Sequence, residues 1–239
     1  MKALILGAGS LPIDPDATPL WLLENDGLLL VERFVRACAA VNADLVFAVR
    51  AQEVKRWRID SVITLAAPGA ALVPISGETA GAACTALLCI RHIDPEAELL
   101  ILNSNEYIDI DYAAPIQHFR DRRLDAGTIV FPSIHPRYSY VRLDADGLII
   151  EAAEKNPISR HATPGFAWFA RGADFIRAAQ DMIRKDANVD GRYFVSLTLN
   201  EMVLRQKRMG VFEIDAKRYH PLKSPRQRSS FEVEDLPTP

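Results

Sequence analysis

Short apolar runs alternate with longer amphipathic segments along the first half of the chain. The short runs have the length of β-strands, and in the longer segments apolar residues recur every three or four positions. This alternation is typical of βα units that surround a mostly parallel sheet. The expected strands span residues 2–6, 44–49, 61–65, 72–75 and 98–102, and the expected helices span about 28–41, 79–93 and 112–122. The first half is therefore predicted to be doubly wound.

From Thr128 the pattern changes to short strands, with a turn signal at residues 144–147. We expect an antiparallel insertion made of strands at 128–131, 139–143 and 148–154. A strand at 165–170, helices at 173–184 and 194–206, and a strand at 210–214 are expected to follow. The prediction is one α/β domain over residues 1–222, with a mostly parallel mixed sheet flanked by helices. Prolines and polar residues predict an irregular tail over residues 223–239.

Composition and charge are ordinary for a globular enzyme of one domain. The 239 residues are 49% hydrophobic and carry a formal net charge of -3. Basic side chains are scattered, which argues against a nucleic-acid partner, and the one basic cluster, residues 217–228, includes prolines. No apolar stretch approaches the roughly 20 residues that span a bilayer, so no membrane segment is expected. No feature of the sequence indicates an oligomeric state.

The cysteines indicate a reducing compartment. Cys38, Cys84 and Cys89 show no CxxC spacing and are odd in number, which favours neither a disulfide framework nor a zinc site. We therefore expect a cytoplasmic protein.

Two glycine-containing loops are candidate binding sites for phosphate or a base. The first strand ends at Gly7 and Gly9, where the missing Cβ would let backbone N–H groups approach a phosphate. A plain tight turn is an equally good interpretation. Gly77, Thr79 and Gly81 lead into a helix whose first N–H groups could meet an anion or a base edge, and ordinary capping by Thr79 is the alternative.

Polar residues follow the strand at 98–102. In open α/β sheets ligands bind beyond the carboxyl ends of strands, so Asn103, Asn105 and Glu106 lie where a ribose or a metal would sit. Carboxylate oxygens suit Mg²⁺ that also binds substrate phosphates. Asn105 and Glu106 are the better ligand candidates, because Asp109 and Asp111 are expected to cap the helix that follows.

Two polar pairs occur later in the chain. Lys155 could act as a point charge on a phosphate, and Glu154 could accept hydrogen bonds from sugar hydroxyls. A solvated surface pair is an equally good interpretation. Asn200 and Glu201 interrupt an otherwise apolar helix, which fits either a site residue or an exposed helix face.

Together these segments resemble the sugar-nucleotidyltransferase family, in the same order, from Met1 to about Leu222. The family's PKPLLEVNGKPLLER segment resembles PLWLLENDGLLLVERF, and its base and phosphate loop resembles GETAGAACTAL. Its EKP and glycine-strand pair resembles EKNPIS followed by ATPGFAWF. The resemblance implies a nucleotidyltransferase-like (GT-A-type) fold. It also implies a protein that acts on a nucleotide and a sugar phosphate, in nucleotide-sugar or surface-polysaccharide biosynthesis.

The resemblance also implies roles for individual residues. Carried over position by position, these are Gly7 and Gly9 at the nucleotide phosphates, Gly77, Thr79 and Gly81 near the base, and Glu154, Lys155 and Gly165 at the sugar phosphate. We further predict that Asn103 binds the nucleotide, that Glu154 and Lys155 form the catalytic pair, and that Asn105, Glu106 and Glu201 bind Mg²⁺. We expect Lys155 to point into the pocket toward Gly165.

Four charged positions of the family pattern are lost. Its first-loop arginine has no counterpart in residues 10–14, its two lysines fall on Leu20 and Leu28, and its metal-binding aspartate falls on Asn105. Removing one donor that stabilises transition-state charge typically costs about 100-fold to 1000-fold in rate. We therefore expect slow or absent nucleotidyl transfer.

Three functions remain open at this point. The first is a divergent nucleotidyltransferase, and the second is a nucleotide-sugar-dependent glycosyltransferase whose carboxylate pair would be Asp109 and Asp111. The third is a binding or regulatory module that kept the pocket but lost catalysis. All three require that the strands ending at Leu6 and Leu102 lie next to each other at one pocket.

Overall fold

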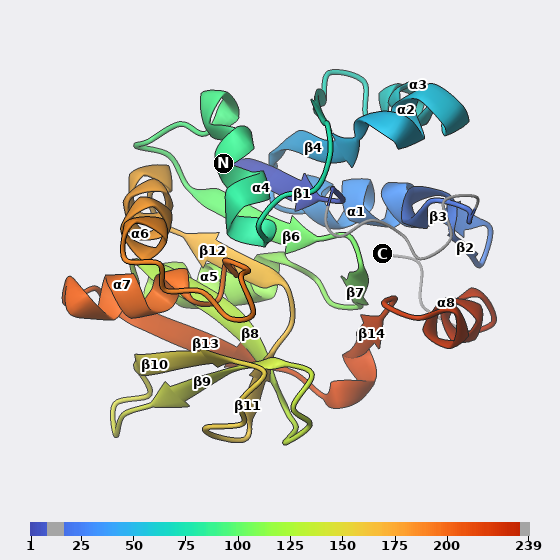
Figure 1. Ribbon diagram of the computed structural model, residues 1–239. Coiled ribbons are helices and arrows are strands. Elements are labelled where there is room, and N and C mark those ends of the chain that lie inside the picture. Colours follow the sequence, from blue (N-terminus) through green and yellow to red (C-terminus); the bar gives the residue numbers. More distant parts are fainter. Residues whose placement is uncertain (9–16, 235–239) are drawn as a thin grey trace.

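The computed structural model describes residues 1–8 and 17–234 (Figure 1). Four parallel strands form one half of its main sheet, in the spatial order β5-β4-β1-β6. Their bounds are β1 Lys2–Leu6, β4 Asp44–Arg50, β5 Ala71–Ile75 and β6 Leu99–Asn103. The central strands β1 and β6 are almost fully buried, because helices cover both faces of a parallel sheet. The predicted doubly wound half is confirmed.

The second half of the chain extends the same sheet with mostly antiparallel strands. β12 joins the two halves by pairing antiparallel with both β6 and β8. Beyond β8 the order continues through β11 and β9 to β10, and β13 pairs with β8 in parallel. The bounds are β8 Ala126–Pro132, β9 Ser139–Leu143, β10 Ile149–Glu154, β11 His161–Thr163, β12 Phe166–Phe169 and β13 Met209–Glu213.

Helices pack on both faces of this sheet (Figure 1). One face carries α1 (Leu30–Ala39), α3 (Ile59–Ala66) and α5 (Ala113–Asp121), and the other carries α4 (Ala82–Leu88), α6 (Gly172–Arg184) and α7 (Thr198–Leu204). The buried side chains of α1 recur at helical spacing, as an amphipathic helix requires. Shorter elements are β2 Glu24–Asn25, β3 Leu28–Leu29, β7 Glu106–Ile108, α2 Ala51–Trp57, and the 3-10 turns Leu20–Leu22, Ile90–His92 and Ala216–Arg218.

The strand predicted at residues 61–65 is wrong, because this segment is helix α3. Its β-branched residues favour a strand by propensity. In the structure Ile59 and Ile63, one helical turn apart, are buried, whereas Leu65 is 84% exposed. Burial at positions i and i+4 is typical of a helix. Packing against α1 therefore favours a helix over a strand in this segment.

The prediction of an irregular tail from residue 223 is wrong, because Pro225–Glu232 form helix α8. Just before it, Tyr219–Pro221 form β14, which pairs antiparallel with β7. Ser224 caps this helix by accepting a hydrogen bond from the Gln227 N–H, and the Gln227 side chain returns to the Ser224 N–H. α8 lies against the N-terminal part of the chain, because the buried Asn25 side chain donates to the carbonyls of Phe231 and Glu234.

The strand order reverses direction at β1. The chain places β4 on one side of β1 and then β6 on the other side. In doubly wound sheets such a switch point leaves a crevice at the carboxyl ends of the two strands, where ligands bind. No helix in the described residues is long and apolar enough to cross a membrane.

Candidate functional site

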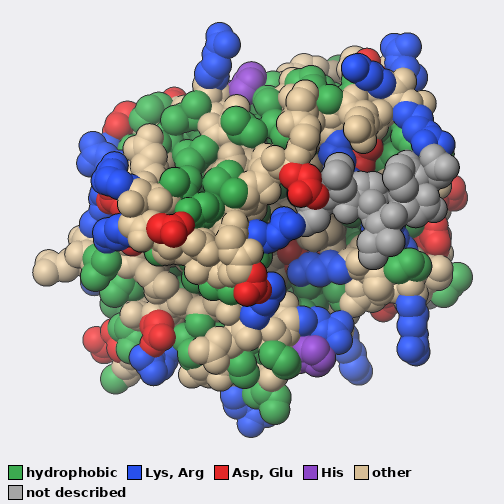
Figure 2. Space-filling model, in the orientation of Figure 1, with side chains coloured by type: hydrophobic (Ala, Val, Ile, Leu, Met, Phe, Trp, Pro, Cys, Tyr) green, Lys and Arg blue, Asp and Glu red, His purple; other side chains and the backbone are tan. Residues whose placement is uncertain are grey.

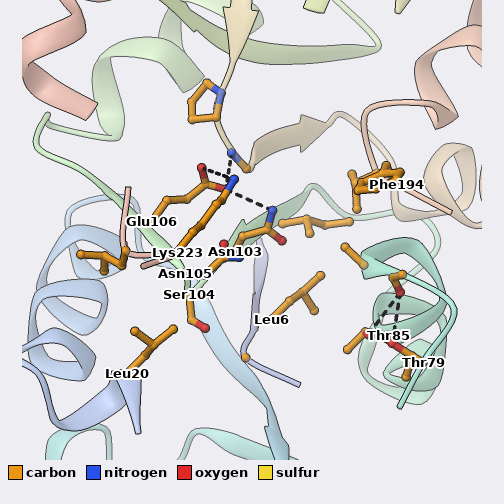
Figure 3. Close-up of a pocket in the computed structure, with 18 of the residues that line it drawn as sticks. Leu6, Leu20, Thr79, Thr85, Asn103, Ser104, Asn105, Glu106, Phe194 and Lys223 are labelled. Carbon is orange, nitrogen blue, oxygen red and sulfur yellow. Dashed lines mark hydrogen bonds and ion pairs between the residues drawn. The ribbon is translucent and has the colours of Figure 1, made fainter. Parts of the chain in front are cut away.

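A pocket of about 1140 Å³ opens at this switch point (Figure 3). Leu6 at the end of β1 pairs in register with Asn103 at the end of β6, and both residues line the pocket. The expectation that the strands ending at Leu6 and Leu102 are neighbours is therefore confirmed. Further walls come from α2, the start of α4, the loop before β12, and the segment from Leu222 to Arg228.

The pocket is rich in positive charge. Among the described residues that line it, seven are lysine or arginine and three are glutamate. The basic residues are Arg50, Lys55, Arg56, Arg137, Arg192, Lys223 and Arg228. Figure 2 shows lysine and arginine side chains gathered around the hollow in the middle of this face. A concave site with this balance attracts anions such as phosphates.

Glu106 forms the floor of the pocket and is only 4% exposed. Its Oε1 accepts hydrogen bonds from the Gly165 N–H at 2.9 Å and from Asn103 Nδ2 at 3.2 Å. Its Oε2 accepts from the Tyr219 hydroxyl at 2.7 Å and lies 3.7 Å from Lys223 Nζ. This carboxylate thus joins β6, β12 and the C-terminal segment at one point.

Gly165 is required by the close approach of its neighbours. A Cβ there would lie 2.2 Å from Asn103 Nδ2 and 2.3 Å from Glu106 Oε1. Its carbonyl also accepts the Asn103 N–H at 2.9 Å. Gly165 lines the pocket, and hydrogen bonds hold both its N–H and its carbonyl.

The loop before α4 forms another wall (Figure 3). Thr79 and Gly81 line the pocket, whereas Gly77 is not among the described lining residues. Gly81 has φ +112°, and a Cβ there would meet the backbone of Tyr193. The Thr79 hydroxyl contacts the Thr85 hydroxyl at 2.7 Å, so Thr79 does not cap α4, whose N-cap is Gly81.

The wall beside β1 is apolar. Gly7 lines the pocket, but its N–H donates to the Ala48 carbonyl at 2.8 Å and its Cα faces the Trp21 ring. Leu20 also lines the pocket, whereas Leu28 lies in the β2–β3 hairpin and is not among its described lining residues. Gly9, expected at the nucleotide phosphates, lies outside the described residues.

Glu154 and Lys155 have different partners. Glu154 lines the pocket and accepts hydrogen bonds from the Ser139 and Ser196 hydroxyls. Burial raises the pKa of the Glu154 carboxyl, and these two hydrogen bonds partly offset that effect. Lys155 has φ +55° and forms an ion pair with Asp190 at 2.8 Å, on the exposed side of the chain. It is not among the described lining residues, so its expected orientation toward Gly165 is not found.

Asn200 and Glu201 of α7 also differ from a ligand site. The Asn200 amide donates to the carbonyl of Ala152 and accepts from its N–H, both at 2.8 Å, and so attaches α7 to the edge strand β10. Glu201 is buried and forms an ion pair with Lys185 at 2.6 Å. Neither residue is among the described residues that line the pocket.

The two aspartates after β7 have structural partners. Asp111, just before α5, accepts a hydrogen bond from the Ala113 N–H, but the N-cap of this helix is Tyr112, so the expected cap by an aspartate is not found. Asp109 instead pairs with Arg218 at 2.8 Å. Neither aspartate is among the described pocket residues, so the carboxylate pair of a glycosyltransferase is not found at this site.

The residues predicted to hold Mg²⁺ do not fit that ion. Glu106 already accepts three hydrogen bonds from protein donors, and Glu201 is engaged by Lys185 away from the pocket. Asn105 lines the pocket and has a buried Oδ1 without a hydrogen-bond partner, but it offers one neutral oxygen. In the part of the chain that is described, no cluster of three His, Cys, Asp or Glu residues could hold a metal.

The sequence interpretation missed the basic residues that surround the pocket. Arg50, Lys55 and Arg56 come from the end of β4 and from α2, and Lys223 and Arg228 come from the segment expected to be irregular. One available signal was Ser224, followed directly by Pro225 and, three residues after Ser224, by Gln227. This pattern is typical of the start of a capped helix. That helix would have placed the basic cluster on ordered structure.

Comparison with known proteins identifies the fold. No protein-family model matches the sequence, and no curated protein matches it significantly. Among matching solved structures, a nucleoside-diphosphate-sugar pyrophosphorylase from Vibrio cholerae RC9 has a TM-score of 0.81 at 19% identity, over 97% of this chain and 99% of that chain.

Two further structures agree with it. A protein assigned as a glucose-1-phosphate thymidylyltransferase from Bacillus anthracis, in complex with sucrose, has a TM-score of 0.72 at 14% identity, over 99% of this chain and 97% of that chain. A UDP-glucose pyrophosphorylase complexed with UDP-glucose has a TM-score of 0.73 at 12% identity, over 97% of each chain. The chain thus has the fold of the sugar nucleotidyltransferases.

Proposed function

We propose that the pocket binds a nucleotide together with a sugar phosphate, or a similar phosphorylated small molecule, and serves nucleotide-sugar or surface-polysaccharide biosynthesis. The observation that carries this proposal is the excess of lysine and arginine in a deep pocket at the carboxyl ends of β1 and β6. Hydrogen bonds from such cations to phosphate are among the strongest that side chains make. The UDP-glucose bound to one protein of the same fold supports the same ligand class.

The two ligands would occupy opposite ends of the pocket. The nucleotide would lie along Gly7, Thr79, Gly81 and Asn103, with Gly77 behind the base. The sugar phosphate would lie near Gly165 and Glu154, whose carboxylate could accept hydrogen bonds from sugar hydroxyls. Phe194, which lines the wall above Thr79 in Figure 3, offers an aromatic face to one of the rings.

Nucleotidyl transfer is the reaction we assign to this arrangement. An oxygen of the sugar phosphate would attack the α-phosphorus of a nucleoside triphosphate, and pyrophosphate would leave. Catalysis of such a step depends on positioning and on cations that stabilise the developing charge. Because Leu20 leaves one wall without a cation, we expect turnover below the range of about 1 to 1000 per second that is normal for enzymes.

A binding or regulatory module is the second candidate. It is favoured by the apolar Leu20 wall and by the engagement of Glu106 with protein donors. Such a module would bind the same ligands and release no pyrophosphate.

A thermal-shift screen tests the binding proposal. The probes are UTP, dTTP, UDP-glucose and glucose 1-phosphate, each with and without Mg²⁺. A ligand at 100 times its dissociation constant stabilises a protein by about 2.7 kcal/mol, which is easily measured. No shift with any probe would overturn the proposal. For the probes that bind, a coupled assay of pyrophosphate release separates the enzyme from the module.

Lys155→Ala tests the predicted role of Lys155 at the sugar phosphate. Lys155 must leave Asp190 to reach a ligand, and its exposed ion pair contributes little to folding. If it does reach the ligand, Lys155→Ala should weaken glucose 1-phosphate binding about tenfold, as loss of a charge-assisted hydrogen bond would. Equal affinities in calorimetry would make Lys155 a surface residue. Asp190→Ala is the matched control, since it frees Lys155 and should not weaken binding.

A further inference from the structure

The three glutamates of the pocket are already engaged by protein donors. Those donors are Gly165, Asn103 and Tyr219 for Glu106, Ser139 and Ser196 for Glu154, and Trp21 and Arg50 for Glu53. A divalent cation binds to carboxylate oxygens that are free to turn toward it. Glu106 and Glu53 accept hydrogen bonds at both carboxylate oxygens, whereas both hydrogen bonds to Glu154 are accepted by its Oε2.

A lysine ammonium instead lies beside the carboxylate on the pocket floor. Lys223 Nζ is 3.7 Å from Glu106 Oε2, which is an ion pair but too long for a hydrogen bond (Figure 3). Burial raises the pKa of the Glu154 carboxyl, and the charge of Lys223 offsets a small part of that rise. The Lys223 side chain is 42% exposed, which leaves its three N–H donors accessible from the pocket.

The backbone around Lys223 is held in place. The Leu222 N–H donates to the Asn105 carbonyl at 2.9 Å, and the Lys223 N–H donates to the Gln227 side chain at 3.0 Å. β14 and the capping box of α8 therefore flank Lys223. Arg228 lines the same wall one turn into α8 and donates from Nε to the Leu222 carbonyl.

We propose that the ammonium of Lys223 takes the place of a divalent metal ion, so that the pocket binds the diphosphate of its ligand without Mg²⁺. This inference rests on the proposed function of the pocket. The ion pair with Glu106 keeps the Lys223 ammonium at the floor of the pocket. Arg228 adds a second positive charge, so that the wall offers two fixed cations to a diphosphate.

Binding of UDP and of inorganic pyrophosphate, measured by calorimetry in excess EDTA, tests this inference. We expect both probes to bind wild-type protein in EDTA, with affinities that added Mg²⁺ does not improve. Lys223→Gln should weaken both about tenfold or more, because a charge-assisted hydrogen bond is lost. Lys223→Arg should retain most of the affinity, because it keeps the charge.

Lys217→Gln is the matched control. Lys217 is an exposed lysine of the same segment and is not among the described residues of this pocket, so its loss should leave both affinities unchanged. Binding that requires Mg²⁺, or equal affinities of Lys223→Gln and wild type, would overturn the inference and leave the proposed function intact. If neither these probes nor the four ligands of the thermal-shift screen bind under any condition, both proposals fail.

Discussion

Two walls of the pocket are opposite in character. The wall beside β1 presents Gly7 and Leu20, and the Gly7 N–H is already bonded to Ala48. The wall from the C-terminal segment presents Lys223 and Arg228, which are held by β14 and α8. The family resemblance places lysines at Leu20 and Leu28, whereas the structure adds Lys223 and Arg228 to the pocket from the opposite end of the chain. The proposed site therefore keeps positive charge although the side chains that supply it differ in position.

We call the wall formed by Lys223 and Arg228 the charged wall. Glu106→Ala should produce the largest effect, because it removes the carboxylate that pairs with Lys223 of this wall. The Gly165 N–H, Asn103 Nδ2 and the Tyr219 hydroxyl would each lose an acceptor, and Lys223 its counter-ion. Unpaired buried donors cost about 1 to 3 kcal/mol each. We expect urea unfolding to show a loss of about 3 kcal/mol or more.

Glu96→Ala is the control for this variant, because the Glu96–Arg171 pair is exposed and should contribute little. A loss below about 1 kcal/mol in Glu106→Ala would show that the charged wall does not depend on this carboxylate.

Gly165→Ala should break the contact between the charged wall and β6. Its new Cβ would overlap Asn103 Nδ2 and Glu106 Oε1. Such overpacking typically costs about 1 to 3 kcal/mol. Urea unfolding measures it, and the double variant with Asn103→Ala should recover part of the loss, since one of the two overlapping groups is gone. Strict additivity of the two substitutions would contradict this account.

Leu20→Lys should sharpen the comparison by adding charge to the apolar wall. Partly exposed ion pairs contribute about 0.2 to 1 kcal/mol, so the affinity for inorganic pyrophosphate should rise by up to about fivefold. Calorimetry measures the change. Leu204→Lys is the control, because Leu204 is exposed and is not among the described pocket residues. An equal gain in the control would indicate a general charge effect instead of a local one.

Glu154→Gln should have the smallest effect, visible in its pH dependence. Burial raises the pKa of Glu154 above its ordinary value of 4.5. The folded state therefore binds this proton more tightly than the unfolded state, and wild-type stability falls as the pH rises from about 4.5 through the raised pKa. Glutamine lacks this titration. Urea unfolding should favour the variant more at pH 7 than at pH 4, and a constant difference would exclude the linkage.

Sequence patterns predict the elements of the sheet well because each strand carries its own buried run, as Lys2–Leu6 and Leu99–Asn103 do. The pattern fails at residues 61–65, where β-branched residues form a helix because packing against α1 determines which side is buried. The family resemblance also places Lys155 at the sugar phosphate, whereas in the structure Lys155 pairs with Asp190 and its ammonium lies 5.9 Å from the centre of the Phe194 ring. That ion pair joins residues 35 positions apart, which no local pattern encodes.

The position of Lys223 in the charged wall also depends on contacts between distant segments. Lys223 follows Leu222, whose N–H bonds to Asn105, and approaches Glu106, so its position depends on the pairing of β14 with β7. Periodicity cannot predict a pairing between segments more than a hundred residues apart. Ser224 and Gln227 form a local sequence motif that predicts the start of a helix. The motif does not predict the surface on which that helix packs.

The contacts of Asn25 with α8 affect the order in which the protein assembles during synthesis. Asn25 donates to carbonyls 206 and 209 residues later in the chain. A ribosome must therefore release nearly every described residue before these contacts can form, whereas β1, β4 and β6 can pair much earlier. Closing so long a loop is slow in entropic terms. The nascent protein should therefore possess a formed sheet before its pocket is complete, because the pocket gains Lys223 and Arg228 only when the last helix docks.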